Sequence, residues 1–319
     1  MKVLRALPPG GGGFRAPAAA TIGVFDGVHR GHQRVLSELV AWAHADGGDA
    51  IVVTFDPHPR EFLFGEKPAA LASLEHRLVL LARAGVDAAL VLPFDEKTAN
   101  TEAEDFVRDV LVGALGAKKI LLGANHRFGH GRKGDLALLL RLGSELGFEA
   151  REVPLEPADD EGHVVSSTAI RNAIREGRLG DAERMLGRPV TVLGRVVKGD
   201  ARGRLLGFPT ANLDLQHEAR PPRGVYAALV SVDEKGRWLA VVNVGRRPTF
   251  HPEADEDLVE AHLLDFHGDV YGKALEVSFL AKLRDERRFP GPDALVAQIR
   301  ADVADARRRF GGLVGGASC

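Results

Sequence analysis

The sequence contains a single cysteine, Cys319, which is the last of its 319 residues. A disulfide within the chain is therefore impossible, and a zinc site built on several cysteines is excluded with it. An excess of charge of one sign is also missing, since 42 Lys and Arg stand against 44 Asp and Glu. Affinity for nucleic acid rests on a basic excess, so this balance argues against a nucleic-acid partner. It still allows a local basic pocket for a phosphorylated small molecule.

Long apolar runs and targeting signals are absent as well. The longest apolar runs, such as residues 136–140, are far too short to cross a bilayer. Residues 1–13 have no apolar segment of the length that a signal peptide needs. We therefore expect a cytoplasmic protein with no membrane partner, while the oligomeric state and any self-association stay open.

The hydrophobic content of 45% is enough for two separate cores, and the length suggests about two domains. In the first part, strand-like apolar runs alternate with helix-like segments. The strand-like runs cover residues 20–25, 50–55, 88–93, 119–123 and 148–153, and the helix patterns residues 32–44, 73–84, 102–113 and 135–146. Continuous apolar runs are typical of parallel strands with both faces covered. This pattern predicts a doubly wound α/β sheet of about five parallel strands.

The pattern changes near Gly187–Pro189, and short strands separated by turn signals follow. We expect these strands at residues 190–197, 225–232, 238–244, 259–266 and 275–283. Their spacing predicts a small antiparallel β-barrel, closed by a helix over residues 292–310 that carries one apolar stripe. The predicted domains are residues 1–186 and residues 187–319.

A glycine-rich segment, residues 23–32, follows the first strand and opens the first helix, where α/β sheets bind ligands. His29 and His32 are three residues apart, so they share one face of a helical turn. Two imidazoles at a helix N-terminus suit a phosphate whose charge grows during reaction. Two surface histidines at a glycine-rich turn are the plainer alternative.

The HxGH element of this segment, together with residues 166–171 (SSTAIR), resembles the superfamily of adenylyl-transferring nucleotidyltransferases. The whole chain resembles, more specifically, the family of bacterial bifunctional riboflavin kinases/FAD synthetases. Residues 54–59 (TFDPHP), 122–129 (LGANHRFG) and 132–135 (RKGD) support this resemblance. It extends from about residue 21 to about residue 308, with the motifs in order.

The resemblance implies the roles in the first domain. His29 and His32 would hold the ATP phosphates and stabilise the transition state. The expected ATP site comprises Gly23, Phe25, Asp26, His29, His32, Ser167, Thr168 and Arg171, and the flavin site Phe62 and Asn125. The alternatives are a turn-capping role for Asp26, helix-capping roles for Ser167 and Thr168, a solvated charge for Arg171 and a core position for Phe62. His126 departs from the family, which usually has Phe there.

Residues 194–212 resemble the riboflavin kinase signature and end in its PTAN element. The implied ATP site comprises Gly199, Gly203, Gly207, Pro209, Thr210 and Asn212. The glycines would let a loop wrap the phosphates with backbone N–H groups. Thr210 and Asn212 are two positions apart, so an extended strand would direct both toward the same face, where they could coordinate Mg²⁺. A turn with a hydrogen-bonding asparagine is the alternative.

Residues 243–250 and 259–266 also match the kinase family in order and spacing. A carboxylate at Glu260 could accept the 5′-hydroxyl proton of riboflavin during phosphoryl transfer. A surface glutamate on a barrel strand is the alternative. Arg284 and Phe289 are expected to cover the flavin ring.

The resulting hypothesis is a bifunctional enzyme with ATP as co-substrate and Mg²⁺ as cofactor. The barrel would phosphorylate riboflavin to FMN, and the α/β domain would adenylylate FMN to FAD with release of pyrophosphate. One alternative is an adenylyltransferase for another phosphorylated cofactor precursor, with an accessory barrel. The other is a flavin sensor without turnover.

Overall fold

The computed structural model describes residues 1–10, 12–65, 69–154, 165–199, 203, 206–233, 236–246 and 257–313. The chain forms two compact units: residues 1–69 with 74–167, and residues 70–73 with 168–319. The predicted domain boundary between residues 186 and 187 stays a prediction.

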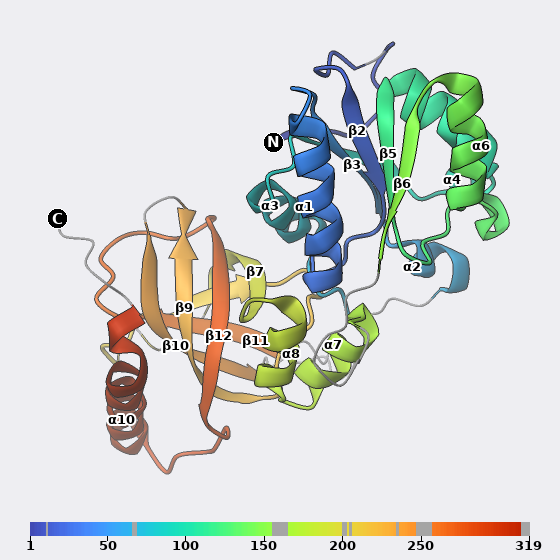
Figure 1. Cartoon of the computed structure of the whole chain (residues 1–319). Helices are drawn as coiled ribbons and strands as arrows, with labels where there is room; N and C mark the ends of the chain where they lie inside the picture. Colours follow the sequence, from blue (N-terminus) through green and yellow to red (C-terminus); the bar gives the residue numbers. More distant parts are fainter. Residues whose placement is uncertain are drawn as a thin grey trace. The chain divides into compact units, whose positions relative to one another are not determined.

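The first unit is built on a six-stranded sheet whose neighbouring strands are all parallel (Figure 1). Its strands are β1 (Lys2–Leu4), β2 (Ala18–Ile22), β3 (Ala50–Asp56), β4 (Ala88–Pro93), β5 (Ala117–Gly123) and β6 (Glu149–Val153), in the order β1-β4-β3-β2-β5-β6. The predicted doubly wound sheet is confirmed, with β1 as an additional edge strand. The connections reverse direction between β2 and β5, so the carboxyl ends of these two strands form the crevice in which such sheets bind ligands.

Helices connect the strands of this sheet. They are α1 (Arg30–His44), α2 (Pro59–Phe64), α3 (Leu74–Arg83), α4 (Glu96–Ala99), α5 (Ala103–Asp105), the π-helix η1 (Phe106–Ala114), the 3₁₀-helix η2 (His130–Arg132) and α6 (Leu136–Leu146). Helix α1 buries Val35, Leu36, Leu39 and Ala43 along one face, which packs on the sheet. The helix predicted over residues 102–113 is a short α-helical turn continued by the π-helix. Helices α7 (Ser167–Arg175) and α8 (Leu179–Leu186) follow β6 in the chain.

The second unit contains a closed antiparallel barrel, which confirms the predicted class. Its strands are β7 (Val190–Val197), β8 (Ala211–Asp214), β9 (Gly224–Val232), β10 (Arg237–Arg246), β11 (Asp257–Leu263) and β12 (Ala274–Arg284), in the order β10-β11-β8-β7-β12-β9, with β9 also paired to β10. Strand β8 is absent from the sequence-based prediction because four residues beside Pro209 leave almost no pattern. Closure leaves no long unpaired strand edge.

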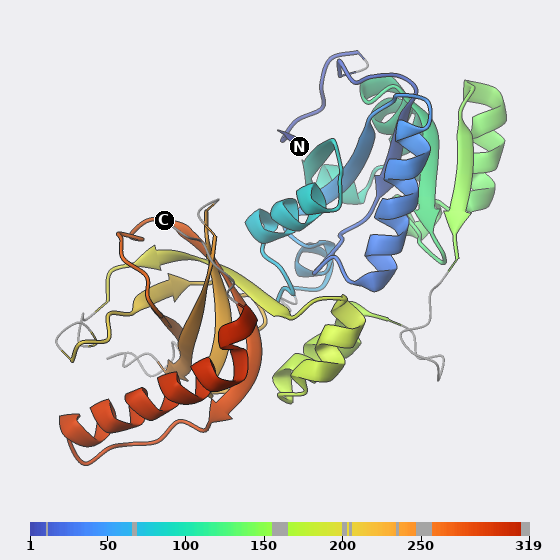
Figure 2. The same ribbon diagram turned by 60° about the vertical axis from the view of Figure 1, so that its left-hand side comes forward.

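Residues on the barrel strands alternate between its interior and its outer face. On β10, Ala240, Val242 and Val244 are fully buried inside the barrel. Leu239 and Val241 point outward and share a cluster with residues of α10 (Pro292–Phe310), the red helix beside the orange strands in Figure 2. Helix α10 therefore covers part of the outer face, and the 3₁₀-helix η4 (Gly311–Leu313) follows it.

Glu218 is the one fully buried carboxylate among the described residues of the second unit. Its Oε1 accepts a hydrogen bond from the backbone N–H of Ser73 at 2.7 Å, and its Oε2 accepts one from Leu193 at 2.8 Å. A buried N–H that loses its acceptor costs about 1–3 kcal/mol. This carboxylate thus ties residues 70–73 to the start of the barrel.

We expect Glu218→Ala to lower the free energy of unfolding of the second unit by about 2–5 kcal/mol, because two buried N–H groups lose their acceptors. Glu218→Gln keeps one carbonyl oxygen and should lose less. The chain has two tryptophans, so in a Trp42→Phe background the fluorescence reports Trp238 of β10 alone. Equal melting temperatures for the parent and Glu218→Ala would contradict the assignment.

Candidate active sites

The turn between β2 and α1 carries the predicted histidines and has a strained backbone. Phe25 and Val28 have φ values of +54° and +39°, a region that side-chain-bearing residues rarely adopt. Phe25, Asp26 and His29 are all less than 8% exposed. Such strain persists only where the surroundings enforce it, and it concentrates at binding sites.

The two imidazoles of this turn lie face to face. The ring centroids of His29 and His32 are 3.6 Å apart with an angle of 18° between the planes, and Phe25 lies 5.1 Å from His32. His29 caps α1, since its Nδ1 accepts the backbone N–H of His32 at 3.4 Å. An accepting Nδ1 carries no proton, so the proton of the neutral His29 ring sits on Nε2 and can be donated to a ligand.

Both His32 and His126 are held neutral. Burial lowers the pKa of His32 well below its usual value, and repulsion of a second positive charge by protonated His29 or His126 and by Arg77 acts in the same direction. Burial, followed by the charge of Arg132, lowers the pKa of His126 to about 4. His32 Nδ1 and His126 Nε2 are buried and have no hydrogen-bond partner among the described residues. Unsatisfied polar atoms at a sheet's ligand crevice are expected where a ligand completes the site.

The other predicted residues of the adenylyl site are spread over several elements. Ser167 Oγ donates to the backbone carbonyl of Asp26 at 3.3 Å, which places it at the histidine turn. Thr168 and Arg171 follow on α7, within the second unit, and their part in binding phosphate stays a prediction. Asn125 follows β5, is exposed and has a φ of +59°. Gly23 continues β2, its N–H donating to Val53.

Phe62 lies on α2 and is 44% exposed, so it is not a core residue. Its ring packs edge-on against Phe94 at 5.9 Å, and Phe94 packs in turn against Phe55 of β3. An exposed aromatic ring on an apolar support is a surface on which a flat ring can stack. The Phe62 ring is therefore accessible for the predicted contact with flavin, which stays a prediction.

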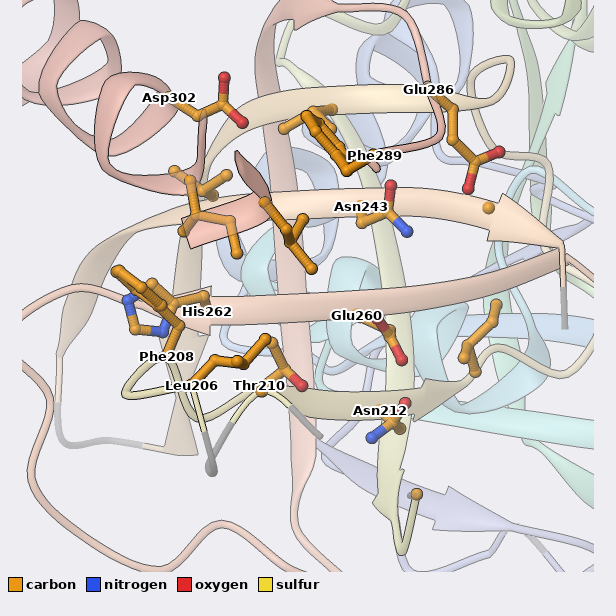
Figure 3. Close-up of a pocket in the computed structure, with 18 of the residues that line it drawn as sticks. Leu206, Phe208, Thr210, Asn212, Asn243, Glu260, His262, Glu286, Phe289 and Asp302 are labelled. Carbon is orange, nitrogen blue, oxygen red and sulfur yellow. The ribbon is translucent and has the colours of Figure 1, made fainter. Parts of the chain in front are cut away.

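The second unit holds a pocket of about 690 Å³ on the outer face of the barrel, next to α10 (Figure 3). Seven residues that the sequence analysis assigns to the kinase site line it, namely Gly199, Gly203, Thr210, Asn212, Glu260, Arg284 and Phe289. Gly207 and Pro209 lie in the adjoining loop and do not line the pocket. Residues from Gly199 to Phe289 thus meet in one cavity.

Three polar side chains form a row across adjacent strands of this pocket. Asn212 of β8 pairs in register with Glu260 of β11, and Glu260 pairs with Asn243 of β10. In-register residues on one face of a sheet lie about 4.5–5.5 Å apart at Cβ, so these groups are direct neighbours. Figure 3 shows them in one column with Thr210 beside it.

The loop before β8 packs closely on this row. A Cβ atom on Gly199 would lie 2.3 Å from Asn212 Nδ2, and one on Gly203 would lie 2.4 Å from the carbonyl oxygen of Phe208. Gly203 therefore requires glycine for a close backbone approach, whereas at Gly199 a side chain would displace the Asn212 amide. His262 of β11 fixes the far end of the loop, because its Nδ1 lies 2.8 Å from the carbonyl oxygen of Pro209.

Arg284 and Phe289 stand at the α10 side of the pocket. The Nη2 and Nε of Arg284 reach the buried carboxylate of Asp302 at 2.9 and 3.0 Å, and Gln298 donates to the same carboxylate. The guanidinium groups of Arg284 and Arg287 lie 5.6 and 4.9 Å from the Phe289 ring centroid. Arg284 thus links α10 through Asp302 to the Phe289 ring. The Phe289 ring lines the pocket.

The sequence analysis does not assign Asn243, Glu286 or His262 to the site, although all three line the pocket. The signal that could have found Asn243 is its polar side chain at an outward position of an otherwise apolar strand. Glu286 and His262 lack such a signal, because only the fold brings them to the cavity. Groups of three or more His, Cys, Asp or Glu side chains that could hold a metal are absent from the described residues.

The fold and the two sites define a chain that joins an α/β unit with a ligand-binding crevice to a barrel whose pocket contains a carboxylate. Comparison with known proteins makes this specific. The family model for FAD synthetase matches residues 14–169, and that for riboflavin kinase matches residues 186–310. Bifunctional riboflavin kinase/FMN adenylyltransferases of Pseudomonas fluorescens and Escherichia coli K12 are 43% and 40% identical, over 90% and 91% of this chain and 91% and 92% of theirs.

The chain belongs to the family of bifunctional riboflavin kinases/FMN adenylyltransferases. It therefore phosphorylates riboflavin to FMN and adenylylates FMN to FAD, with ATP as co-substrate. The match of both halves disfavours an adenylyltransferase with a merely accessory barrel. A solved structure described as a macrolide-efflux protein of Streptococcus pneumoniae is also similar, with 31% identity, a TM-score of 0.78 and coverage of 96% of this chain and 99% of that one. The described helices of this chain include none long and apolar enough to cross a membrane.

The buried His126 predicts a pH-dependent stability. Its folded pKa of about 4 lies below the unfolded value near 6.5, so the unfolded chain binds the extra proton first and stability falls as pH drops from 6.5 to 4. In His126→Phe this contribution disappears, and the free energy of unfolding should fall less steeply over that window. Denaturant titrations of both proteins at several pH values measure the difference; parallel curves would contradict a buried neutral His126.

Proposed function

We propose that the pocket beside α10 is the riboflavin kinase site and that Glu260 is its general base. The observation that carries the proposal is the in-register row of Asn212, Glu260 and Asn243 on the outer face of the barrel. A carboxylate held between two amides, at the wall of a cavity large enough for small-molecule substrates, suits proton abstraction from a hydroxyl group.

In this reaction the 5′-hydroxyl oxygen of riboflavin forms a bond to the γ-phosphorus of ATP. The bond between that phosphorus and the β,γ-bridging oxygen breaks, ADP leaves, and the hydroxyl proton passes to the Glu260 carboxylate. The loop around Gly199 and Gly203 would wrap the phosphates with backbone N–H groups. Phe289 would stack on the flavin ring, held in place by Arg284.

Mg²⁺ fits the donors of this pocket. Thr210 and Asn212 supply neutral oxygen ligands of the hard type that Mg²⁺ prefers, and both line the cavity with Glu260. The ion would neutralise charge on the ATP phosphates when bound. The cytoplasmic location and self-association stay predictions.

For adenylyl transfer, we propose the turn between β2 and α1 as the phosphate site. A phosphate oxygen of FMN attacks the α-phosphorus of ATP, and the bond to the β-phosphate breaks to release pyrophosphate. His29 and His32 would stabilise the charge that develops on the α-phosphate as neutral hydrogen-bond donors. Ser167, Thr168 and Arg171 would bind the β- and γ-phosphates, and Phe62 and Asn125 would contact the flavin nucleotide.

Glu260→Gln should reduce riboflavin phosphorylation by about 10²–10⁴-fold, because the amide keeps the shape of the side chain but cannot accept the proton. The KM for riboflavin should change far less than kcat. Steady-state kinetics with riboflavin measure this, and conversion of added FMN to FAD by the same preparation is the control. Riboflavin turnover near the wild-type rate would remove Glu260 from the mechanism.

His32→Ala should reduce FAD formation from FMN by about 10²–10³-fold, the usual cost of one lost donor to a developing anion. FMN formation should stay near the wild-type rate, since Glu260 lies in the other unit. His44→Ala, at the other end of α1, is the matched control and should keep both activities. FAD synthesis within a few-fold of wild type in His32→Ala would refute the role of His32.

A further inference from the structure

Arg77 of α3 is a buried cation next to the adenylyl site. Its side chain is 5% exposed, and its Nη1 donates to the carbonyl oxygen of Val24 while its Nη2 donates to that of Phe55, both at 2.9 Å. Val24 begins the strained turn that leads to His29, and Phe55 is near the carboxyl end of β3. One guanidinium fork thus joins two segments that lie on neighbouring parallel strands.

The charge of Arg77 has no direct carboxylate partner in the part of the chain that the structure describes. Among the described residues its hydrogen bonds go to backbone carbonyls, and its buried Nε has no acceptor. Burial lowers the pKa of Arg77, while the more distant charges of Asp26 and Asp56 act in the opposite direction. Burying a cation in this way is costly. A neutral side chain that donates hydrogen bonds would suffice if the only role at this position were to link two backbone segments.

We propose that Arg77 is a positioning residue of adenylyl transfer, which holds the turn carrying His29 and His32 and sets the charge of their surroundings. This inference rests on the function proposed above for His32. Arg77 acts through its hydrogen bonds to the backbone at Val24 and Phe55 and through the electrostatic effect of its positive charge on the histidines.

The geometry of the turn explains why an arginine is needed. The carbonyl of Val24 accepts from Thr54 Oγ1 at 3.1 Å as well as from Arg77, so it is clamped by two donors from different elements. Phe25, the next residue, has a positive φ that relaxes if the clamp is lost. A lysine has one nitrogen on a flexible stem and cannot present two planar N–H groups to two separate carbonyls.

The electrostatic part concerns the proton of His32. The groups that act on this ring are His29 from its own turn, His126 from the segment after β5, and Arg77 from α3. A fixed cation disfavours a second positive charge nearby, so His32 stays neutral as pH falls. Removing the cation therefore raises the pKa of His32, and the loss of FAD formation in acid moves to higher pH.

The experiment compares Arg77→Met, Arg77→Lys and Arg83→Met in the full chain. Arg83 is an exposed arginine on the same helix and serves as the matched control. The measurements are kcat and KM for FMN-to-FAD conversion between pH 5 and 8, with thermal unfolding followed by Trp42 fluorescence in a Trp238→Phe background as the test of folding of the first unit.

We expect Arg77→Met to lose about 10²-fold in kcat, the cost of a displacement of about 1 Å at a reacting centre. The fall of kcat at low pH, the acid limb of the pH profile, should move to higher pH in this variant. Arg77→Lys keeps the charge but not the fork, so kcat should fall by about tenfold with the acid limb unmoved. Arg83→Met should match wild type. A purely structural role would not move the pH profile.

Wild-type kcat and an unmoved acid limb in Arg77→Met would overturn the inference. If that variant does not fold, Arg77→Lys decides, and a wild-type rate there overturns it equally. Failure of the proposed function is seen separately, as retained activity in His32→Ala. Backbone amide resonances of Gly23–Val28 in Arg77→Met then still show whether the turn depends on Arg77.

Discussion

The register of strands β8, β11 and β10 is the constraint on which the proposed kinase pocket depends. Side chains alternate between the two faces of a strand, so a slip of one residue would turn Glu260 into the apolar interior and bring Val259 or Ala261 to the pocket. Both of these residues are fully buried, which makes such a slip costly. Closure of the barrel pairs every strand on both sides and so removes the freedom to slip. The stability of the interior thereby holds the carboxylate in place.

The first unit reaches its geometry by a different route. Its ligand crevice lies where parallel strands end, and the backbone there has no further strand partner. Positive φ at Phe25 and Val28 and desolvated histidines are each unfavourable alone. The buried sheet, Arg77 and Thr54 together supply the contacts that hold them. The unfavourable groups are concentrated at the turn that we propose stabilises charge in adenylyl transfer.

The two sites differ in chemistry because their attacking groups differ. The hydroxyl of riboflavin is a neutral alcohol and gains from a base, which is the role proposed for Glu260. The phosphate of FMN is already an anion and needs no base. Its reaction depends instead on positioning and on stabilisation of charge, for which neutral donors and a fixed cation are suited.

Local sequence patterns predict both fold classes, and the family motifs select most of the residues proposed for the kinase site. Apolar runs and turn signals are local patterns, so they identified the parallel sheet and the barrel, and the matching motifs brought seven residues to what proved to be one pocket. Short elements such as β1 and β8 escaped because three or four residues carry no period. Three contacts became known from the folded chain alone: Asn243 lies beside Glu260, Arg284 pairs with Asp302, and Arg77 reaches Val24 across 53 positions of sequence. These contacts join residues far apart in the chain, and a contact of that kind leaves no periodic or compositional trace in either segment.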